Sequence, residues 1–262
     1  MVAEITVADG IATISFNRPD VLNAVGLDGG FATLRSMFET LRDDASVRAI
    51  ILTGQGRAFC AGAELDGFVQ DGELTLTPER LRQMFDIDLN ALLRVIQDLP
   101  KPFVTAINGT VAGGGLGLAL TGDIVLASDR AKFHCAFLKI LALVPDAGTS
   151  WMLPSLMGRN RALPFALLGD GITAEEALGA GLIFRSVPAD ILMAEAWGYA
   201  ERLAQMSPEA LRQTRRLFTD APSMSYDAML DQEREANCLL VQGGKTGQGV
   251  VDFLSRRRST TD

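Results

Sequence analysis

The stretch from Asn108 to Asp123, NGTVAGGGLGLALTGD, constrains this chain more than any other. It follows an apolar run, Phe103–Ile107, that is typical of a buried strand. Three consecutive glycines, Gly113 to Gly115, let the backbone turn with positive φ and let another group approach closely. The apolar residues that follow predict a helix whose first N–H groups lack intrahelical partners and suit an oxygen carrying negative charge. A flexible loop or tight helix packing would use the same glycines, so this stretch alone leaves both interpretations open.

A second stretch, Ala58–Leu65 (AFCAGAEL), has the same organisation. It follows the apolar run Ala49–Thr53 and also leads from a strand through small residues toward a helix. Chemistry that forms an enolate from a thioester needs two backbone N–H donors aimed at the carbonyl oxygen, each worth on the order of 3 kcal/mol. Small residues keep such donors accessible, so the paired loops favour this chemistry.

The remaining pattern predicts an α/β protein. Asp9-Gly10 separates two alternating runs and predicts a hairpin, and Leu27–Leu41 shows helical spacing. Thr77-Pro78 predicts the start of a helix reaching about Leu99. Further elements are expected as follows: helices over Asp146–Leu156 and Arg161–Leu168, a capping box at Thr173–Glu176, a last strand at Ile183–Val187, and helices over Ile191–Gln205, Pro208–Phe218, Ser225–Val241 and Gly247–Leu254. We therefore expect a strand-and-helix region over 1–190 and a helical region over 191–262.

Composition narrows the function classes. The net charge of −8 argues against a non-specific nucleic-acid binder, and the basic cluster Arg256–Arg258 is typical of a solvated tail. Three scattered cysteines and a single histidine indicate a reducing, cytoplasmic setting without a structural zinc site. The N-terminus shows no signal-peptide pattern. The uncharged stretch Pro102–Gly122 is too rich in glycine for a membrane span.

Several blocks of this sequence resemble the crotonase superfamily, the enoyl-CoA hydratases and isomerases. The blocks are NRPDVLNA (Asn17–Ala24), AFCAGAEL (Ala58–Leu65), KPFVTAINGTVAGGGLGLALTGDI (Lys101–Ile124), VPDAGTSWMLPSLMGRNRA (Val144–Ala162) and, more weakly, GVVDFLSRR (Gly249–Arg257). The resemblance covers nearly the whole chain. It implies a spiral of ββα units, a helical C-terminal region that forms a homotrimer or a hexamer, and an acyl-CoA thioester as the ligand, with coenzyme A as part of the substrate and no separate cofactor.

The resemblance also implies roles for individual residues. The N–H groups of Ala63 and Gly114 would hold the thioester oxygen. Ala61 and its neighbouring backbone would accept hydrogen bonds from the adenine, Leu65 would line the same pocket, and Gly62 and Gly113 would belong to the substrate-binding surface.

The hydratases of this family use two glutamates to activate water, and this chain lacks both. The matching positions hold Gly117 and the pair Ala136-Phe137, which cannot move a proton. Asp146 remains, at a position where several isomerases of the superfamily carry an aspartate. The pattern AFxK…VPDxGxxWxLP in Ala136–Pro154 is similar to the ring-opening isomerases of phenylacetate breakdown. One carboxylate there could remove and return a proton, for about 10²–10⁴ in rate.

Asp146 has a second interpretation, as the N-cap of the following helix. The segment 139–149 also departs from the isomerase pattern. It is about one residue longer, has Leu141-Ala142 where glycine is usual, and has Thr149 in place of a glycine. These changes lie beside the proposed base and could shift it or narrow the pocket.

Other residues receive structural interpretations. His134 could be a base but is more typical of a structural residue on a strand, and Glu64 is more typical of a cap or loop brace. Asp71 and Glu73 could reach a pocket, although solvated positions suit them better. Nothing around Cys60 or Cys135 indicates an activated thiolate.

The sequence therefore predicts an acyl-CoA isomerase that stabilises a thioester enolate and uses Asp146 as acid and base. A hydratase or thioester hydrolase with another way of activating water is one alternative. A CoA-ester-binding protein with little catalysis is the other.

Overall fold

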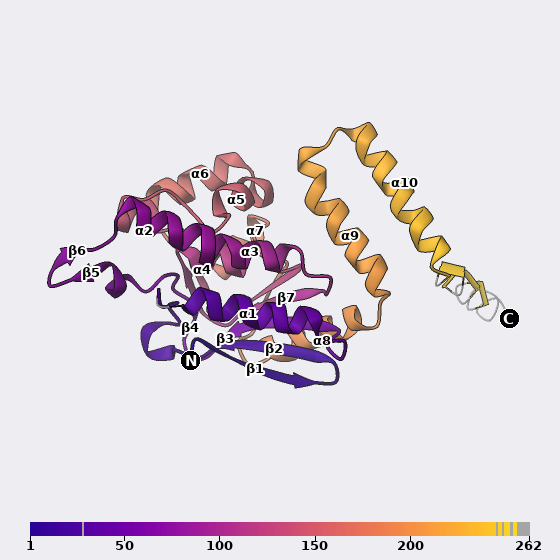
Figure 1. The fold of residues 1–262 in the computed structure, drawn as a ribbon, viewed down its shortest axis with the longest axis horizontal. Coiled ribbons are helices and arrows are strands. Elements are labelled where there is room, and N and C mark those ends of the chain that lie inside the picture. Colours follow the sequence, from indigo (N-terminus) through magenta and orange to yellow (C-terminus); the bar gives the residue numbers. More distant parts are fainter. Residues whose placement is uncertain (28, 245, 248, 252–253, 256–262) are drawn as a thin grey trace. The chain divides into compact units, whose positions relative to one another are not determined.

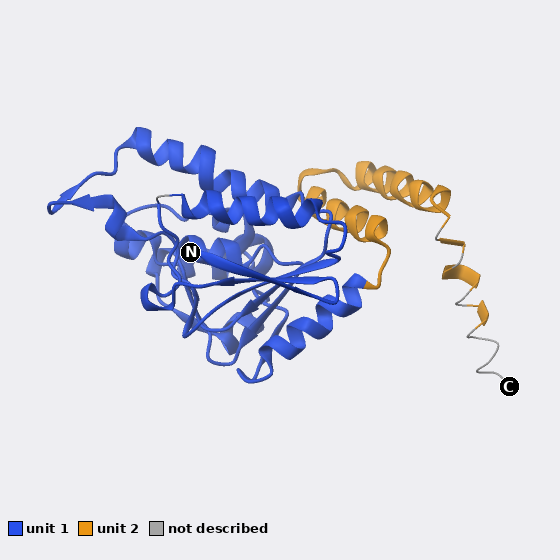
Figure 2. Cartoon of the chain, turned by 60° about the horizontal axis from the view of Figure 1, so that its bottom comes forward, with its two compact units in different colours: residues 1–204 blue, residues 205–262 orange. Residues whose placement is uncertain are grey.

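The computed structural model describes residues 1–27, 29–244, 246–247, 249–251 and 254–255. The chain divides into two compact units, residues 1–204 and 205–262, coloured separately in Figure 2. The predicted boundary at residue 190 follows the last strand of the chain. The first compact unit extends further, because it also includes the next helix, α8 (Leu192–Ala204). Its buried residues Leu192, Ala196 and Ala200 join one apolar cluster with side chains of the main sheet.

A six-stranded sheet runs through the first unit in the order β1-β2-β3-β7-β9-β12 (Figure 1). β1 and β2 form the antiparallel hairpin predicted at Asp9-Gly10, and every other neighbouring pair is parallel. The predicted runs in β3 and β7 are buried along almost their full length. The strands are β1 (Ala3–Ala8), β2 (Ile11–Phe16), β3 (Ala49–Gly54), β7 (Phe103–Ile107), β9 (Ile124–Ser128) and β12 (Arg185–Val187).

A second sheet has the strand order β11-β10-β8-β4. Three of its strands each come directly after a strand of the main sheet in the chain. β3 is followed by β4, β7 by β8 and β9 by β10, and helices then return the chain to the main sheet. This repeat confirms the predicted ββα units. The strands of the second sheet are β4 (Ala58–Cys60), β8 (Thr110–Ala112), β10 (Lys132–His134) and β11 (Ile172–Thr173), and a separate ribbon is formed by β5 (Val69–Gln70) and β6 (Glu73–Leu74).

Helix α1 (Gly30–Asp43) buries the apolar positions that the spacing predicted: Phe31, Leu34, Phe38 and Leu41. The ring of Phe38 packs edge-on against Phe103 of β7, with 5.4 Å between the ring centroids. Burial of side chains of this size contributes about 1.5–3 kcal/mol each, so the apolar stripe of α1 fixes the helix against the sheet.

The predicted helix over 78–99 begins as expected, because the side chain of Thr77 accepts a hydrogen bond from the Arg80 N–H at 3.2 Å. It is not uniform, however. A π-helical segment, η3 (Met84–Leu89), separates α2 (Pro78–Gln83) from α3 (Asn90–Gln97). The guanidinium of Arg35 donates to the carbonyl oxygen of Ile87 at 2.7 Å, which gives this widened turn a partner from α1.

The capping box at Thr173 is confirmed: its side chain accepts from the Glu176 N–H, and the Glu176 carboxylate accepts from the Thr173 N–H. The helix predicted from Asp146 begins three residues later, at Thr149. The remaining elements of the first unit are η1 (Pro19–Val21), η2 (Leu65–Phe68), α4 (Gly114–Ala119), η4 (Phe137–Leu141, π-helical), α5 (Thr149–Met157), α6 (Arg159–Leu168) and α7 (Ala174–Gly179).

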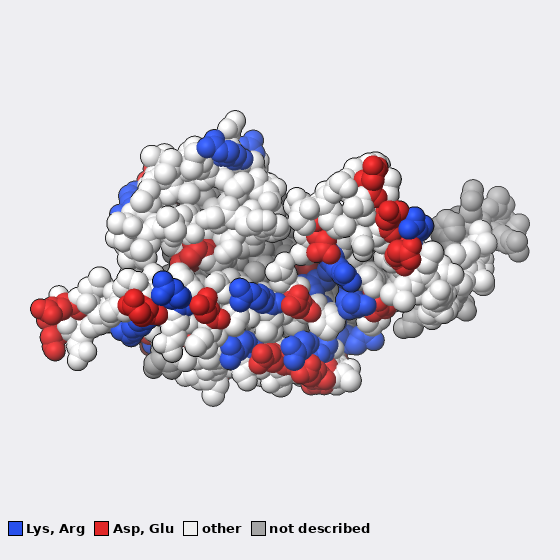
Figure 3. Space-filling view, turned by 45° about the horizontal axis from the view of Figure 1, so that its top comes forward, with Lys and Arg blue, Asp and Glu red and all other residues white. Residues whose placement is uncertain are grey.

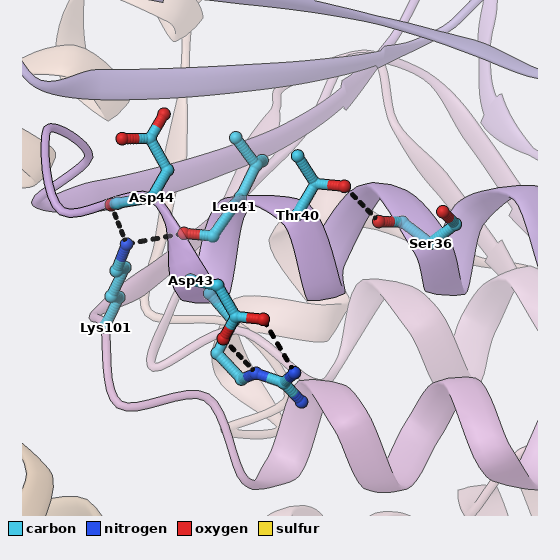
Figure 4. Close-up of polar contacts among 7 residues, drawn as sticks. Ser36, Thr40, Leu41, Asp43, Asp44 and Lys101 are labelled. Carbon is cyan, nitrogen blue, oxygen red and sulfur yellow. Dashed lines mark hydrogen bonds and ion pairs between the residues drawn. The ribbon is translucent and has the colours of Figure 1, made fainter.

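Lys101, directly before β7, ties the start of that strand to the end of α1 (Figure 4). Its ammonium group donates to the carbonyl oxygens of Leu41 and Asp44. A cation at a helix C-terminus complements the helix dipole and the carbonyls that lack intrahelical partners. Partial burial lowers the pKa of Lys101. This anchor fixes where β7 begins, and β7 leads directly into the glycine-rich stretch.

The second unit contains α9 (Pro208–Asp220), η5 (Ala221–Ser223) and α10 (Tyr226–Gln242). Both helices match their predictions to within two residues, and each begins after a serine whose side chain caps it, Ser207 and Ser225. Within α9 and α10 only Gln213 and Ala236 are buried. The helix predicted over Gly247–Leu254 lies partly outside the described residues, and Arg256–Arg258 lie wholly outside them.

Blue and red side chains lie interspersed on the face drawn in Figure 3, rather than gathering into a basic surface. This mixture agrees with the net charge of −8. In the part of the chain that the structure describes, no helix combines the length and the apolar character that a membrane span requires.

Candidate active site

The first small-residue loop, after β4, is held by hydrogen bonds to Val25. The Val25 N–H donates to the Gly62 carbonyl at 2.8 Å, and the Glu64 N–H donates to the Val25 carbonyl at 2.9 Å. These two bonds flank Ala63, which pairs with Val25 as an isolated parallel bridge. In such a bridge the N–H of the central residue points away from its partner. The N–H of Ala63 is therefore held in place without being used.

The second loop turns at Gly113, whose φ of +54° and ψ of −135° suit only glycine. Helix α4 then begins at Gly114. Gly115 packs directly on the first loop, because a Cβ there would lie 2.3 Å from the Cys60 carbonyl oxygen. A Cβ at Gly62 would lie 3.0 Å from the Gly114 nitrogen. The glycines of both loops thus permit a backbone contact that side chains would prevent.

Ala63 and Gly114 border the same cavity, which has a volume of about 120 Å³. Among the described residues, neither of their N–H groups donates a hydrogen bond to another protein group. Ala61, Leu65 and Gly113 border the cavity as well, whereas Gly62 packs against the backbone of Gly114 and is not among the described residues that line the cavity. The structure therefore gathers the predicted backbone donors around one space.

Asp146 also borders this cavity, and its carboxyl faces the second loop. A Cβ built on Gly114 would lie 3.7 Å from Asp146 Oδ1. This oxygen is buried and has no hydrogen-bond partner among the described residues. Burial raises the pKa of Asp146 to about 6, from 3.8. A buried, unpartnered carboxyl of this kind is a candidate acid or base.

The interpretation of Asp146 as a side-chain cap is wrong. Helix α5 has Gly148 as its N-cap and no side-chain cap. The backbone of Asp146 serves the helix instead, since its carbonyl oxygen accepts from the Thr149 N–H at 2.9 Å and from the Thr149 hydroxyl at 2.6 Å. Thr149, one of the departures from the isomerase pattern, therefore braces this turn and leaves the carboxyl free.

The two positions at which hydratases carry glutamates contain no acid. Ala136 and Phe137, the pair at the second position, border the cavity with a methyl group and an aromatic ring. Gly117 faces the turn that carries Asp146, and a Cβ there would lie only 2.2 Å from the Ala147 carbonyl oxygen. A glutamate side chain at position 117 has no room in this structure. Of the described residues that line the cavity, Asp146 alone is ionisable.

Glu64 braces the first loop, as its structural interpretation predicted. Its carboxylate pairs with both terminal nitrogens of the Arg18 guanidinium, at 2.7 and 2.9 Å. Arg18 also donates to the Ala24 carbonyl at 2.9 Å. The hydrogen bond from Arg18 lowers the pKa of Glu64, which keeps this group ionised and unsuited to carrying protons.

The remaining sequence candidates do not line the cavity. The ring of His134 packs against Gly171, and burial lowers its pKa. Asp71 and Glu73 are exposed in and beside the β5–β6 ribbon. Burial raises the pKa of Cys60 to about 12 and that of Cys135 to about 11, so both thiols stay protonated at neutral pH.

The apolar wall of the cavity was not predicted from the sequence. It comes mainly from α1, from α2 with η3, and from η4, which are distant in the chain. The sequence does contain apolar residues at helical spacing after Thr77. Such spacing is equally typical of a helix that packs against the hydrophobic core, so it does not indicate a cavity wall. The wall residues are Phe31, Phe68, Leu81, Met84, Leu89, Phe137, Ile140, Leu141 and Leu143.

Comparison with known proteins agrees with this geometry. The family model described as enoyl-CoA hydratase/isomerase matches residues 6–260. The 1,2-epoxyphenylacetyl-CoA isomerase of Escherichia coli is 37% identical over 256 residues, which cover 96% of this chain and 94% of that protein. A protein of Rhodobacter capsulatus named "Probable enoyl-CoA hydratase" is 36% identical over 255 residues, with the same coverage of 96% and 94%. The crystal structure of enoyl-CoA hydratase from Bacillus anthracis superposes with a TM-score of 0.85 at 28% identity, over 92% of each chain.

These relatives bear both isomerase and hydratase names at nearly equal similarity, so similarity alone does not select the reaction. It does establish the fold of repeated ββα units and the kinship of the whole sequence. The match extends over both glycine-containing loops and the turn that carries Asp146. The chain belongs to the enoyl-CoA hydratase/isomerase family of crotonase-fold enzymes.

Proposed function

We propose that this protein is an enoyl-CoA isomerase that moves a double bond or rearranges a ring through a thioester enolate. The observation that carries the proposal is the partly buried carboxyl of Asp146, whose Oδ1 is buried and unpartnered and which shares a cavity with the unused N–H groups of Ala63 and Gly114. Relatives with both hydratase and isomerase names share the fold, so the choice between them depends on this constellation and on the missing glutamates.

The reaction would begin with the thioester oxygen held by the two N–H groups as an oxyanion hole. The Asp146 carboxylate removes a proton from the carbon alpha to the thioester, and the electron pair of that C–H bond moves into the carbonyl. Negative charge develops on the oxygen, where each donor contributes on the order of 3 kcal/mol of stabilisation. The protonated carboxyl then returns the proton to the gamma carbon, which gives the conjugated isomer without loss or gain of atoms.

A carboxyl with a pKa of about 6 suits both steps. At pH 7 to 8 it is mostly ionised and can accept a proton, and its raised pKa makes it a stronger base than an ordinary aspartate, with a pKa closer to the operating pH. The chemistry uses only protein groups and the substrate, whose coenzyme A portion serves as the handle. No water needs to be activated, consistent with Gly117 and the pair Ala136-Phe137 at the hydratase positions.

The test is Asp146→Asn, which preserves side-chain volume and removes the proton carrier. Wild-type enzyme and variant are given β,γ-unsaturated acyl-CoAs, and the products are separated chromatographically. We expect kcat to fall by about 10²–10⁴, with binding of a saturated acyl-CoA retained. Unchanged isomerisation by the variant would refute the role of Asp146. A 3-hydroxyacyl-CoA as the main wild-type product would identify a hydratase, free coenzyme A a hydrolase, and binding without any turnover a CoA-ester-binding protein.

We further propose that the second unit mediates homo-oligomerisation, as the family resemblance implies. Its helices α9 and α10 bury little, while Phe218, Tyr226 and Val241 are 79%, 78% and 61% exposed. Apolar side chains on such a small unit favour contact with another copy. Light scattering of the full chain should report a trimer or a hexamer, and a monomer at micromolar concentration would contradict the proposal. All three cysteines are free, which is consistent with a cytoplasmic location.

A further inference from the structure

The acyl side of the cavity is built almost entirely from hydrocarbon. Leu81, Met84 and Leu89 approach from α2 and η3, Phe31 from α1, and Phe137 from η4. Two of these walls are π-helical segments, a widened form of helix that often occurs at functional sites. The backbone departs from regular helix on both sides of the space that receives the acyl group, which indicates that its shape is specific.

No cation lies in the lining of this cavity. Among the described residues that border it, none is lysine, arginine or histidine, and none carries a side-chain hydroxyl or amide. The one charge that can develop there is the negative charge of Asp146. An acyl group ending in a carboxylate would therefore place a second anion in an apolar space, without a partner and next to a like charge.

The volume limits the acyl group as well. The cavity measures about 120 Å³ and includes the space beside Ala63 and Gly114. For scale, an engineered apolar cavity of about 150 Å³ in another protein binds benzene. An acyl group of about six carbons fills a space of this size, and further carbons must extend beyond it toward solvent, to which the lining residue Ile140 is 68% exposed.

We propose that the site selects a compact, uncharged acyl group of about six carbons and rejects acyl groups that end in a carboxylate. This inference rests on the proposed function, since it places the thioester at Ala63 and Gly114. Each carbon buried in the cavity contributes about fourfold in affinity, the equivalent of about 0.8 kcal/mol. Affinity rises by that factor per carbon up to about six carbons and then levels off. A terminal carboxylate weakens binding at least 100-fold.

Calorimetry of the full-length protein with saturated acyl-CoAs tests this without any turnover. The series runs from acetyl-CoA to decanoyl-CoA, and adipyl-CoA is compared with hexanoyl-CoA as the charged analogue of equal length. Met84→Ala should extend the rise in affinity by one or two carbons. Met84→Lys should narrow the difference between adipyl-CoA and hexanoyl-CoA by at least tenfold. Met193→Ala is the matched control, because Met193 lies on α8 and does not border the cavity.

The outcomes separate this inference from the proposed reaction. Adipyl-CoA bound within tenfold of hexanoyl-CoA, or an affinity still rising fourfold per carbon at ten carbons, would overturn the inference. If the protein prefers uncharged acyl groups of about six carbons while Asp146→Asn still isomerises normally, the inference on selectivity stands and the catalytic assignment of Asp146 is refuted. If no acyl-CoA binds at all, both fail.

Discussion

Substitution of Gly117 by alanine tests whether the turn carrying Asp146 depends on the absence of a side chain at that position. Gly117 lies inside α4, where alanine would normally stabilise the helix by about 1 kcal/mol. In this structure a Cβ at position 117 would lie 2.2 Å from the carbonyl oxygen of Ala147 and 2.5 Å from its Cβ. Because ordinary contacts are about 3.5 Å, the turn or the helix must move by about 1 Å.

The cost follows from these distances. Overpacking in a well-packed region typically costs about 1–3 kcal/mol, against a gain in helix propensity of about 1 kcal/mol. We therefore expect a net destabilisation of up to about 2 kcal/mol, or up to about 8 °C in Tm for a chain of this size. Displacement of Asp146 by about 1 Å should reduce kcat by about 10²-fold, while saturated acyl-CoA binding changes far less.

Gly198→Ala is the matched control. Gly198 also lies within a helix, α8, but a Cβ there meets nothing within 4 Å. This variant should be more stable than wild type by about 0.5–1 kcal/mol, with unchanged kcat. Thermal unfolding and initial rates on the same preparations provide both readouts. If Gly117→Ala proved as stable and as active as Gly198→Ala, the packing of α4 against the turn of Asp146 would be refuted.

Four further predictions rest on the same geometry. The pKa of Asp146 rises to about 6 in the fold from 3.8, so its ionisation removes stability as pH rises from 4 through 6. Urea unfolding should therefore show Asp146→Asn to be more stable than wild type, by on the order of 2–3 kcal/mol at pH 8 and by less at pH 5. An equal difference in stability at the two pH values would contradict this assignment. By the same ionisation, wild-type kcat/KM should rise with pH to a plateau above about pH 6, and a flat profile from pH 5 to 8 would count against Asp146 as the base. Glu64→Gln should lose the half-buried ion pair with Arg18. The free energy of unfolding measured by chemical denaturation should fall by about 1 kcal/mol, and KM should rise measurably. If both values stayed unchanged, the loop would not depend on this ion pair. A thiol reagent should leave Cys60 and Cys135 unmodified in the native protein, because both are buried with raised pKa values; rapid modification of all three thiols before unfolding would refute that burial.

Local chemistry in the sequence was sufficient for much of the fold. The Asp9-Gly10 turn, the Thr77 cap and the Thr173 capping box each depend on residues within a few positions, so short patterns predicted them. The apolar stripe of α1 and the buried runs of β3 and β7 follow from spacing alone. The three adjacent glycines alone suited a close backbone approach or a flexible loop, and the fold shows Gly115 packed against the Cys60 carbonyl.

The environment of each side chain was decided by contacts that are distant in the chain. Asp146 reads equally well as a cap or an acid, and only the tertiary fold shows Gly148 at the cap and the carboxyl buried beside Gly114. The sequence shows only that position 117 holds a glycine where the hydratases have a glutamate. The fold shows that the backbone of Ala147 occupies the space that a side chain there would need. The sequence by itself determined most of the elements, because these depend on local propensity, and its resemblance to the crotonase superfamily singled out the candidate backbone donors. The pKa of the acid and the apolar wall of the cavity required the tertiary structure, because burial depends on which separate elements surround a group.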